Sequence, residues 1–146
     1  MDPTACFCIN ARRAAGALTR RYDQALAPVG LKVTQYSLLR TIQRLRRPAI
    51  TALAAATGLE RSTLGRNLRV LERRGLVALS PGADERERVA RLTEVGSGLL
   101  RRAMPLWSRA QSEVDAMLPD GDAARATALF ARLTRSESAP VPGTSP

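Results

Sequence analysis

A helical pattern over Arg61 to Arg74 carries side chains that can read the edges of DNA bases. Its leucines recur at i, i+4 and i+7, which predicts one buried face and turns the polar positions outward. Arg and Asn make paired hydrogen bonds to guanine and adenine in the major groove, whereas Ser and Thr serve bases or phosphates. The candidate DNA-binding residues of this helix are Ser62, Thr63, Arg66, Asn67 and Arg69. The competing interpretation is the solvated face of an ordinary amphipathic helix.

A charged loop follows, between an apolar strand at 76–79 and a second strand at 89–92, and it carries Asp84, Arg86 and Arg88. An Arg at a loop tip can enter a narrow minor groove, where the negative potential is enhanced. Asp84 stands two residues before Arg86 and is expected to hold it in an extended pose. The alternative is a solvated loop whose exposed ion pair contributes about 0–1 kcal/mol.

The composition supports a nucleic-acid partner. The 146 residues have a formal net charge of +10, and of the 23 basic residues only Lys32 is a lysine. Arg suits phosphates and base edges, although a GC-rich coding bias also favours Arg over Lys. Aromatic residues make up 3 % of the chain, which argues against single-strand binding on stacking platforms.

Several function classes are excluded or disfavoured. The chain has no His, no Gly-rich phosphate loop and no convincing carboxylate pair, so we expect neither an enzyme nor a bound cofactor. No run of 18 apolar residues and no signal peptide is visible, which favours a cytoplasmic protein without a membrane partner. Cys6 and Cys8 are then expected to be thiols rather than a structural disulfide.

The elements that must position these residues follow from breakers and periodicity. We expect an N-terminal arm and helix within 1–33, with the helix over 8–26. A DNA-binding domain over 34–93 holds helices at 35–46, 52–57 and 61–74, capped at Thr34, at Thr51 and by Gly75 at its end, and then a hairpin. Helices at 94–117 and 122–134 form a C-terminal part (94–135), with a kink or break at Pro105, and 136–146 forms a disordered tail.

Two helices joined by a turn at Gly58, followed by a hairpin, predict a mainly α fold with a small β wing. The chain resembles the MarR family of bacterial winged helix–turn–helix regulators over residues 8–133. The resemblance lies in the Gly58-Leu59 turn, the run 61–64 leading into Leu68 and Leu71, Gly75-Leu-Val, the wing at 84–86 and Leu92-Thr-Glu-Val-Gly96.

The resemblance implies a homodimer with interleaved helices from both termini, which binds a pseudo-palindromic operator in double-stranded DNA. It places Ser62, Thr63, Arg66 and Asn67 at major-groove positions, Arg86 at the wing tip with Asp84 orienting it, and Arg73 and Arg74 nearer phosphates.

A peroxide-sensing branch of that family has a reactive Cys at the start of its first helix, beside tyrosines of the partner. Aligning through Tyr22 puts Cys8 at that position, and a shift of two residues puts Cys6 there. Arg12 and Val33 stand where the branch has further tyrosines. Three possibilities stay open: oxidant or thiol sensing by a lowered-pKa thiolate, metalloid binding, or inert packing at an interface.

Effectors of the resembled family are small aromatic or anionic molecules that sit between the dimer helices and the winged domain. Tyr36, Trp107 and Arg12 are the candidate lining residues, although plain core packing is the alternative for Trp107. The leading hypothesis is therefore a dimeric, sequence-specific DNA-binding regulator, a repressor released by a small molecule or an oxidant. The alternative is a winged-helix interaction module that binds protein or RNA without effector control.

Overall fold

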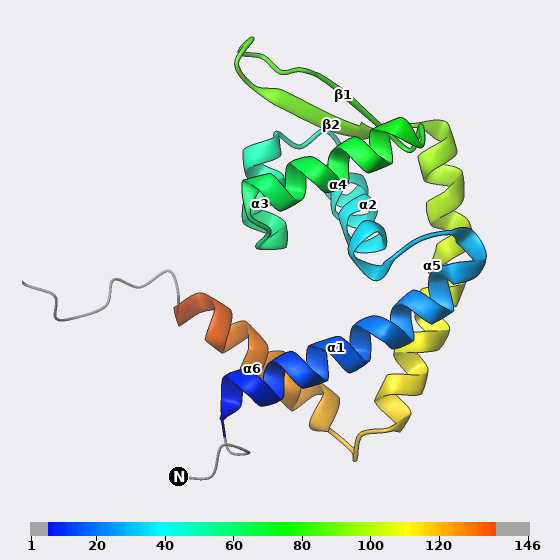
Figure 1. Cartoon of the computed structure of the whole chain (residues 1–146), viewed down its shortest axis with the longest axis vertical. Helices are drawn as coiled ribbons and strands as arrows, with labels where there is room; N and C mark the ends of the chain where they lie inside the picture. Colours follow the sequence, from blue (N-terminus) through cyan, green and yellow to red (C-terminus); the bar gives the residue numbers. More distant parts are fainter. Residues whose placement is uncertain (1–5, 137–146) are drawn as a thin grey trace, which may run out of the picture. The chain divides into compact units, whose positions relative to one another are not determined.

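The computed structural model describes residues 6–136. In chain order the described part comprises α1 (Phe7–Leu26), a 3-10 turn η2 (Ala27–Val29), α2 (Val33–Leu45), α3 (Ile50–Thr57), α4 (Arg61–Arg73), β1 (Val77–Pro81), β2 (Arg88–Leu92), α5 (Glu94–Ala116) and α6 (Asp122–Ser136). The chain divides into two compact units, one ending at Ala110 and the other beginning at Gln111. Figure 1 shows the elements in sequence colours, and the mainly α fold with a small β hairpin is confirmed.

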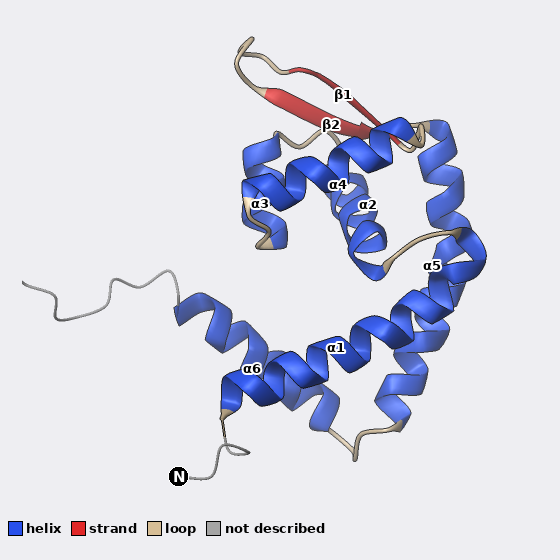
Figure 2. Cartoon of the chain, in the orientation of Figure 1, coloured by secondary structure: helices blue, strands red, loops and turns tan. Residues whose placement is uncertain are grey.

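The hairpin of β1, β2 and their loop, here called the wing (residues 77–92), is antiparallel. Its register runs from Val77 opposite Leu92 to Pro81 opposite Arg88. Figure 2 shows the two strands in red beside α4. The N–H of Ala90 also donates to the carbonyl of Pro48 at 2.9 Å, which ties the wing to the residues just before α3.

The core of the first unit is built from leucines of successive helices. Leu64, Leu68 and Leu71 of α4 are all at most 1 % exposed, so the predicted buried stripe is confirmed. They pack in one cluster with residues of α2, α3, β1 and α5. Because three leucines of one face are locked in this core, the remaining positions of α4 are held facing outward.

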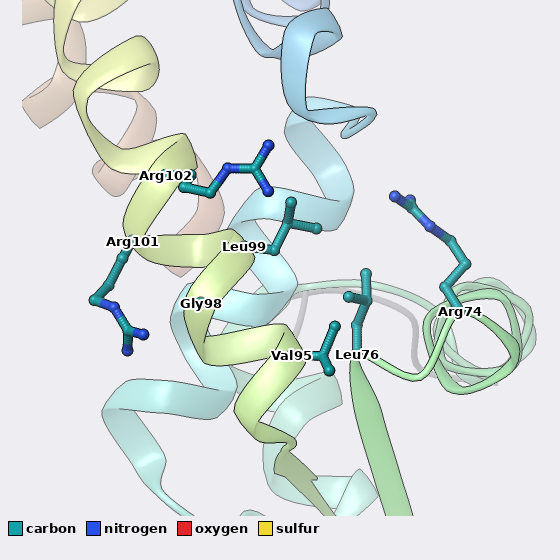
Figure 3. A pocket seen from close by; sticks show the side chains of 7 residues that line it. All are labelled: Arg74, Leu76, Val95, Gly98, Leu99, Arg101 and Arg102. Atoms are coloured by element: carbon teal, nitrogen blue, oxygen red, sulfur yellow. The ribbon is translucent and has the colours of Figure 1, made fainter.

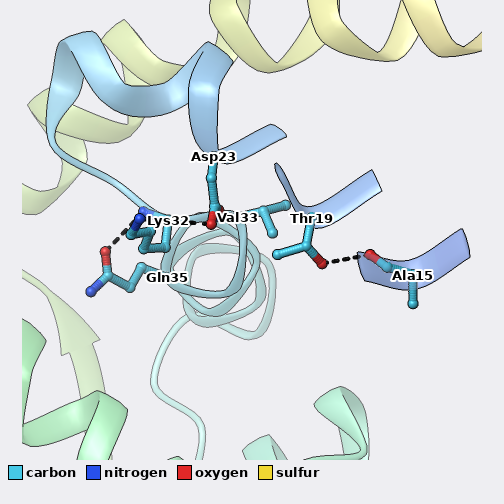
Figure 4. A network of polar contacts seen from close by, with 6 residues as sticks. All are labelled: Ala15, Thr19, Asp23, Lys32, Val33 and Gln35. Carbon is cyan, nitrogen blue, oxygen red and sulfur yellow. Dashed lines mark hydrogen bonds and ion pairs between the residues drawn. The ribbon is translucent and has the colours of Figure 1, made fainter. Parts of the chain in front are cut away.

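The predicted start of α2, at residue 35, is wrong by two residues. Thr34 does not cap it, because the helix begins at Val33 with Lys32 at the cap position. The Val33 N–H donates to Oδ1 of Asp23 at 2.7 Å, and the Lys32 N–H donates to Oε1 of Gln35 at 3.0 Å (Figure 4). A carboxylate on α1 thus serves the helix start that a local Thr was expected to serve.

Two other helix boundaries also differ from expectation. α3 begins at Ile50 after Ala49, so Thr51 lies inside its first turn and does not cap it. α5 continues through Pro105, so the break, one of the two expected outcomes, is wrong, and the kink stays a prediction. Buried Ala103 and the partly buried Leu106 and Trp107 pack on the core on either side of Pro105, and this packing offsets the missing backbone hydrogen bond.

The ends of α4 and α6 complete the comparison. Gly75 follows α4 with a φ of 69°, as a C′ glycine should. α6 reaches Ser136, two residues past the expected end at Thr134. The predicted tail beyond Ser136, like residues 1–5, lies outside the described residues.

Hydrogen bonds of Thr93, here called the Thr93 joint, connect the end of the wing to the start of α5. The Thr93 hydroxyl donates to the Gly75 carbonyl at 2.6 Å and accepts from the Gly96 N–H at 2.9 Å. It therefore caps α5, as predicted, while holding the end of the α4 segment. The Thr93 N–H donates to the Leu76 carbonyl at 3.1 Å. A Cβ on Gly96 would lie 2.9 Å from the carbonyl carbon of Leu76, so this position requires glycine.

Candidate nucleic-acid interface

The outward face of α4 is polar and basic. Ser62, Arg66, Arg69 and Arg73 are exposed, and Thr63 and Asn67 are half-buried beside them. Nη2 of Arg66 lies 3.4 Å from the Thr63 hydroxyl oxygen, so Thr63 is placed to steady the Arg66 side chain. These residues form a continuous stripe that can present several hydrogen-bond donors and acceptors to one groove.

Gly65 lies within this stripe and has no partner that requires it. A Cβ built on Gly65 meets no atom within 4 Å in the described chain. Glycine costs about 1 kcal/mol in mid-helix relative to alanine. Packing against another helix of the described chain therefore does not explain this glycine.

The wing loop is held by its own backbone. The Gly82 N–H donates to the Glu87 carbonyl at 2.6 Å, and the Glu87 N–H donates to the Asp84 carbonyl at 2.9 Å. Oδ1 of Asp84 accepts from the Arg86 backbone N–H at 3.1 Å. Within residues 6–136, no ion pair joins Asp84 to the Arg86 guanidinium, so Asp84 shapes the turn rather than gripping the Arg86 side chain. Arg86 and Arg88 are exposed.

A depression of about 240 Å³ joins the wing to the helical part of the interface. It is lined by Ile50, Thr51, Arg61, Arg86, Glu87 and Arg88. Three guanidinium groups, one from α4 and two from the wing, border one space beside the first residues of α3. Arg61 and Thr51 were missed as site residues from the sequence. Their position in the first turns of α4 and α3 was the available signal, because helix starts favour phosphate.

Arg74 lies apart from the stripe. It follows α4, and its Nη2 would be 3.4 Å from a Cβ built on Gly30 in the linker between α1 and α2. Figure 3 shows its side chain directed toward that linker. It shares a cavity with Leu76, Leu99 and Arg102, whereas the neighbouring Arg73 lies at the end of the α4 stripe.

A second site lies on the α1, α2 and α5 side of the first unit. Trp107 stacks against Tyr36 with ring centres 5.7 Å apart and against Tyr22 at 6.5 Å. The three rings border a cavity of about 660 Å³, here called the aromatic cavity. Its other lining residues are Val33, Ser37, Arg40, Thr41, Gln43 and Arg44.

The aromatic cavity combines apolar walls with positive charge. Burial raises the pKa of the Tyr36 phenol, and the nearby Arg40 guanidinium partly opposes that rise. Tyr36 therefore stays neutral at physiological pH and can donate a hydrogen bond. Arg12 is exposed and is not among the lining residues, so Arg40 and Arg44 supply the cations that were expected from Arg12.

Cys6 and Cys8 are exposed thiols at the start of α1. Tyr22 follows Cys8 by 14 positions on the same helix, which separates them by roughly 21 Å along its axis. Tyr22 instead belongs to the aromatic cavity. Contact between a thiol and the predicted sensing tyrosine is thus impossible within one chain. Within the described range, no group of three or more Cys, Asp or Glu residues is placed to hold a metal ion.

Neither the terminal helices nor any other described helix is long and apolar enough to cross a bilayer. A family model described as the MarR family matches residues 29–87. No curated protein sequence matches the chain.

Several solved structures are similar to this chain. The transcriptional regulator MosR of M. tuberculosis, in complex with DNA, is 41 % identical, with 91 % of this chain and 96 % of that chain covered and a TM-score of 0.82. CouR, a transcriptional repressor bound to a DNA duplex, is 23 % identical with coverages of 90 % and 94 % and a TM-score of 0.82.

BpsR of Bordetella bronchiseptica, whose DNA binding is regulated by 6-hydroxynicotinic acid, is 18 % identical with coverages of 92 % and 96 % and a TM-score of 0.84. The last two similarities concern the fold, whereas the similarity to MosR extends to the sequence over nearly the whole of both chains. The chain therefore belongs to the MarR family of winged helix–turn–helix transcriptional regulators.

Proposed function

We propose that two copies of this chain bind a pseudo-palindromic DNA operator, each with α4 in the major groove and the wing in the adjacent minor groove. The observation that carries the proposal is the shared depression between α3, α4 and the wing, bordered by Arg61, Arg86 and Arg88. It joins the start of α4 to the wing, and its three arginines outnumber the single carboxylate of Glu87, so it suits a DNA phosphate. The DNA complexes of MosR and CouR support it.

Within the stripe, Arg66 is the proposed base reader, with Thr63 steadying its guanidinium. Contact with DNA would then explain Gly65, which no neighbour in the described chain explains. A residue without a side chain lets the backbone of α4 approach the DNA closely. This explains why a helix-weakening residue occupies a position with free space around it.

A homodimer is proposed from the apolar side chains that each unit leaves in solvent. On α1, Phe7 and Ile9 are 85 % and 48 % exposed, and on α6, Leu129, Phe130 and Leu133 are each about half exposed. Large apolar side chains left in water are costly, and a group such as the three within about one turn of α6 marks an interaction surface. A second copy supplies the same surface with two-fold symmetry, which matches a palindromic operator.

The experiment is footprinting of duplex DNA from the protein's own promoter region. We expect a protected site with two-fold symmetry and half-sites one helical turn apart, with an affinity that falls steeply as salt increases. Binding without any preferred site, or to single-stranded nucleic acid as well as to duplex, would contradict the proposal and favour a general interaction module.

The aromatic cavity is proposed as the effector site that makes the protein a releasable repressor. Three aromatic rings with Arg40 and Arg44 suit a small aromatic anion, and BpsR, which has the same fold, is regulated by 6-hydroxynicotinic acid. With that acid as probe, quenching of the single Trp107 reports binding. Arg40→Gln should weaken the quenching and Arg12→Gln should not. Equal effects of the two variants would place the ligand elsewhere.

Thiol sensing is proposed for Cys6 and Cys8. A thiolate that attacks hydrogen peroxide breaks its O–O bond and becomes a sulfenic acid, and hydroxide leaves. A second thiol can then attack the sulfenic sulfur, form a disulfide and release water. Both thiols are exposed at the start of α1, where a dissolved oxidant can reach them. DNA release by hydrogen peroxide should be lost or slowed in Cys6→Ser or in Cys8→Ser. The same response in wild type and both variants would refute this role.

A further inference from the structure

A second cavity, of about 560 Å³, lies between the segment after α4 and the first half of α5. It is called the arginine cavity here, and it is lined by Arg74, Leu76, Val95, Gly98, Leu99, Arg101 and Arg102. It shares no lining residue with the aromatic cavity or with the depression beside the wing. None of the roles proposed above uses it.

The floor of the arginine cavity is apolar. Val95 and Leu99 are one turn apart on α5 and face Leu76 at the start of the wing segment (Figure 3). Val95 is 65 % exposed and supplies most of the open apolar surface, whereas Leu76 is 3 % exposed and lies beneath it. An apolar ligand group that covers exposed apolar surface in such a cavity gains binding free energy, because both surfaces leave water.

The rim of the cavity is cationic. Figure 3 shows Arg102 and Arg74 projecting from the two sides of the opening, above Leu99 and Leu76. Among the described residues, neither guanidinium has an ion pair or a side-chain hydrogen bond. Arg101 also lines the cavity, but its side chain points to the other side of α5. Two unsatisfied guanidinium groups beside one apolar floor suit a carboxylate, which each can bind with two parallel hydrogen bonds.

We propose that the arginine cavity binds a small amphipathic carboxylate. The carboxylate lies against Arg74 and Arg102, and its hydrocarbon body covers Leu76, Val95 and Leu99. The cavity volume is in the range of about 300–1,000 Å³ that small-molecule sites occupy. The single negative charge and the apolar body are both required, because neither the floor nor the rim alone gives specific binding.

The cavity's position gives such a ligand a consequence. Arg74 and Leu76 follow the proposed recognition helix, and Gly98 to Arg102 belong to α5, so the ligand bridges the two elements that the Thr93 joint connects. Any effect on operator binding rests on the function proposed above. Binding to the cavity does not, and it is therefore measured without DNA.

The test is an amide NMR titration of the full-length protein with hexanoate, using the Gly98 amide as the reporter. Glycine amides fall in a separate region of the spectrum, and the Gly98 peak is identified by its loss in Gly98→Ala. Hexanol is the control that lacks the charge, and acetate is the control that lacks the apolar body. The Trp107 indole peak reports the aromatic cavity in the same spectra.

We expect hexanoate, but neither control, to shift the Gly98 peak at millimolar concentration. Arg74→Gln and Arg102→Gln should each raise the Kd about three- to tenfold, as loss of one charge-assisted pair predicts. Arg101→Gln is the matched control and should leave the Kd within about twofold of wild type. All three arginines are exposed, so these variants should keep the fold.

Three results would overturn the proposal. Hexanoate could shift the Trp107 indole and leave Gly98 unchanged, which would assign it to the aromatic cavity. Hexanol could shift Gly98 as hexanoate does, which would leave the arginines without a role. No shift of Gly98 with hexanoate would mean that the protein in solution does not bind a carboxylate in this cavity. Each of these results is independent of whether the protein binds an operator.

Discussion

Replacing Gly96 by alanine should destabilise the protein although alanine is the better helix former. A Cβ at this position would lie 2.9 Å from the carbonyl carbon and 3.2 Å from the Cα of Leu76, and closer still to the carbonyl oxygen. These are backbone atoms, so they cannot rotate away as a side chain could. The same carbonyl accepts the Thr93 N–H, and moving it weakens the joint between the wing and α5.

The magnitude follows from opposing terms. Overpacking against a fixed neighbour costs about 1–3 kcal/mol, and a weakened backbone hydrogen bond costs about 1 kcal/mol. The gain in helix propensity from Gly to Ala is about 1 kcal/mol, which offsets roughly the hydrogen-bond term. We therefore expect Gly96→Ala to lower the free energy of unfolding by about 1–3 kcal/mol.

The assay is urea unfolding followed by far-UV circular dichroism, at one fixed protein concentration for all variants. The matched control is Gly98→Ala on the same helix, where the added Cβ would meet only Arg101 at 3.7 Å, an ordinary contact. It should raise the free energy of unfolding by up to about 1 kcal/mol. If Gly96→Ala proves as stable as Gly98→Ala, the reasoning about the joint is refuted.

Three further predictions concern the wing, α4 and the aromatic cavity. Arg86→Ala should weaken operator binding with little change in the free energy of unfolding, because Arg86 is exposed; wild-type affinity would show that the wing tip does not touch DNA. Gly65→Ala should raise the free energy of unfolding by about 1 kcal/mol yet weaken operator binding. Unchanged binding would show that the α4 backbone at Gly65 does not lie close to DNA. The raised pKa of buried Tyr36 makes folding favour the protonated phenol, so stability should fall as pH rises above about 10, the ordinary tyrosine value. Urea titrations at several alkaline pH values should show a smaller fall in Tyr36→Phe, and an identical fall would contradict this assignment.

The order of the elements could be predicted from the sequence because each depends on local signals. Leu64, Leu68 and Leu71 have a helical spacing, and all three are buried. Gly75 marks the end of α4, and Thr93 marks the start of α5, as their residue types predict. The two-strand wing followed from two short apolar runs around a charged loop.

The failures share a different cause, which is contact between residues far apart in the chain. Asp23 caps α2 from ten residues away, so the local preference of Thr34 for a cap position did not decide the boundary. α5 continues through Pro105 because its flanking turns are packed on the core. Arg40 replaces Arg12 in the aromatic cavity because it lies on α2, beside Tyr36.

The kinds of side chain in the candidate site could be predicted from the sequence, but not all of the residues that form it. Residue types predict Arg66 and Arg86 as candidates, because exposed guanidinium groups on a helix and on a loop tip suit the two grooves of DNA. Arg61 joins them only through the depression that the fold forms beside the wing. Asp84 was expected to hold a side chain, but it holds the Arg86 backbone N–H instead, since the tight turn places that donor nearer.

The central claim is that α4 reads a DNA sequence, and its most direct measurement is the ratio of two affinities. Binding to the footprinted duplex is compared with binding to a scrambled duplex of equal length at one salt concentration, for wild type and Arg66→Ala. We expect wild type to prefer the footprinted duplex by about 1,000-fold or more, and Arg66→Ala to lose about 1–3 kcal/mol on that duplex alone. A ratio near one for wild type, or an equal loss on both duplexes, would contradict the claim.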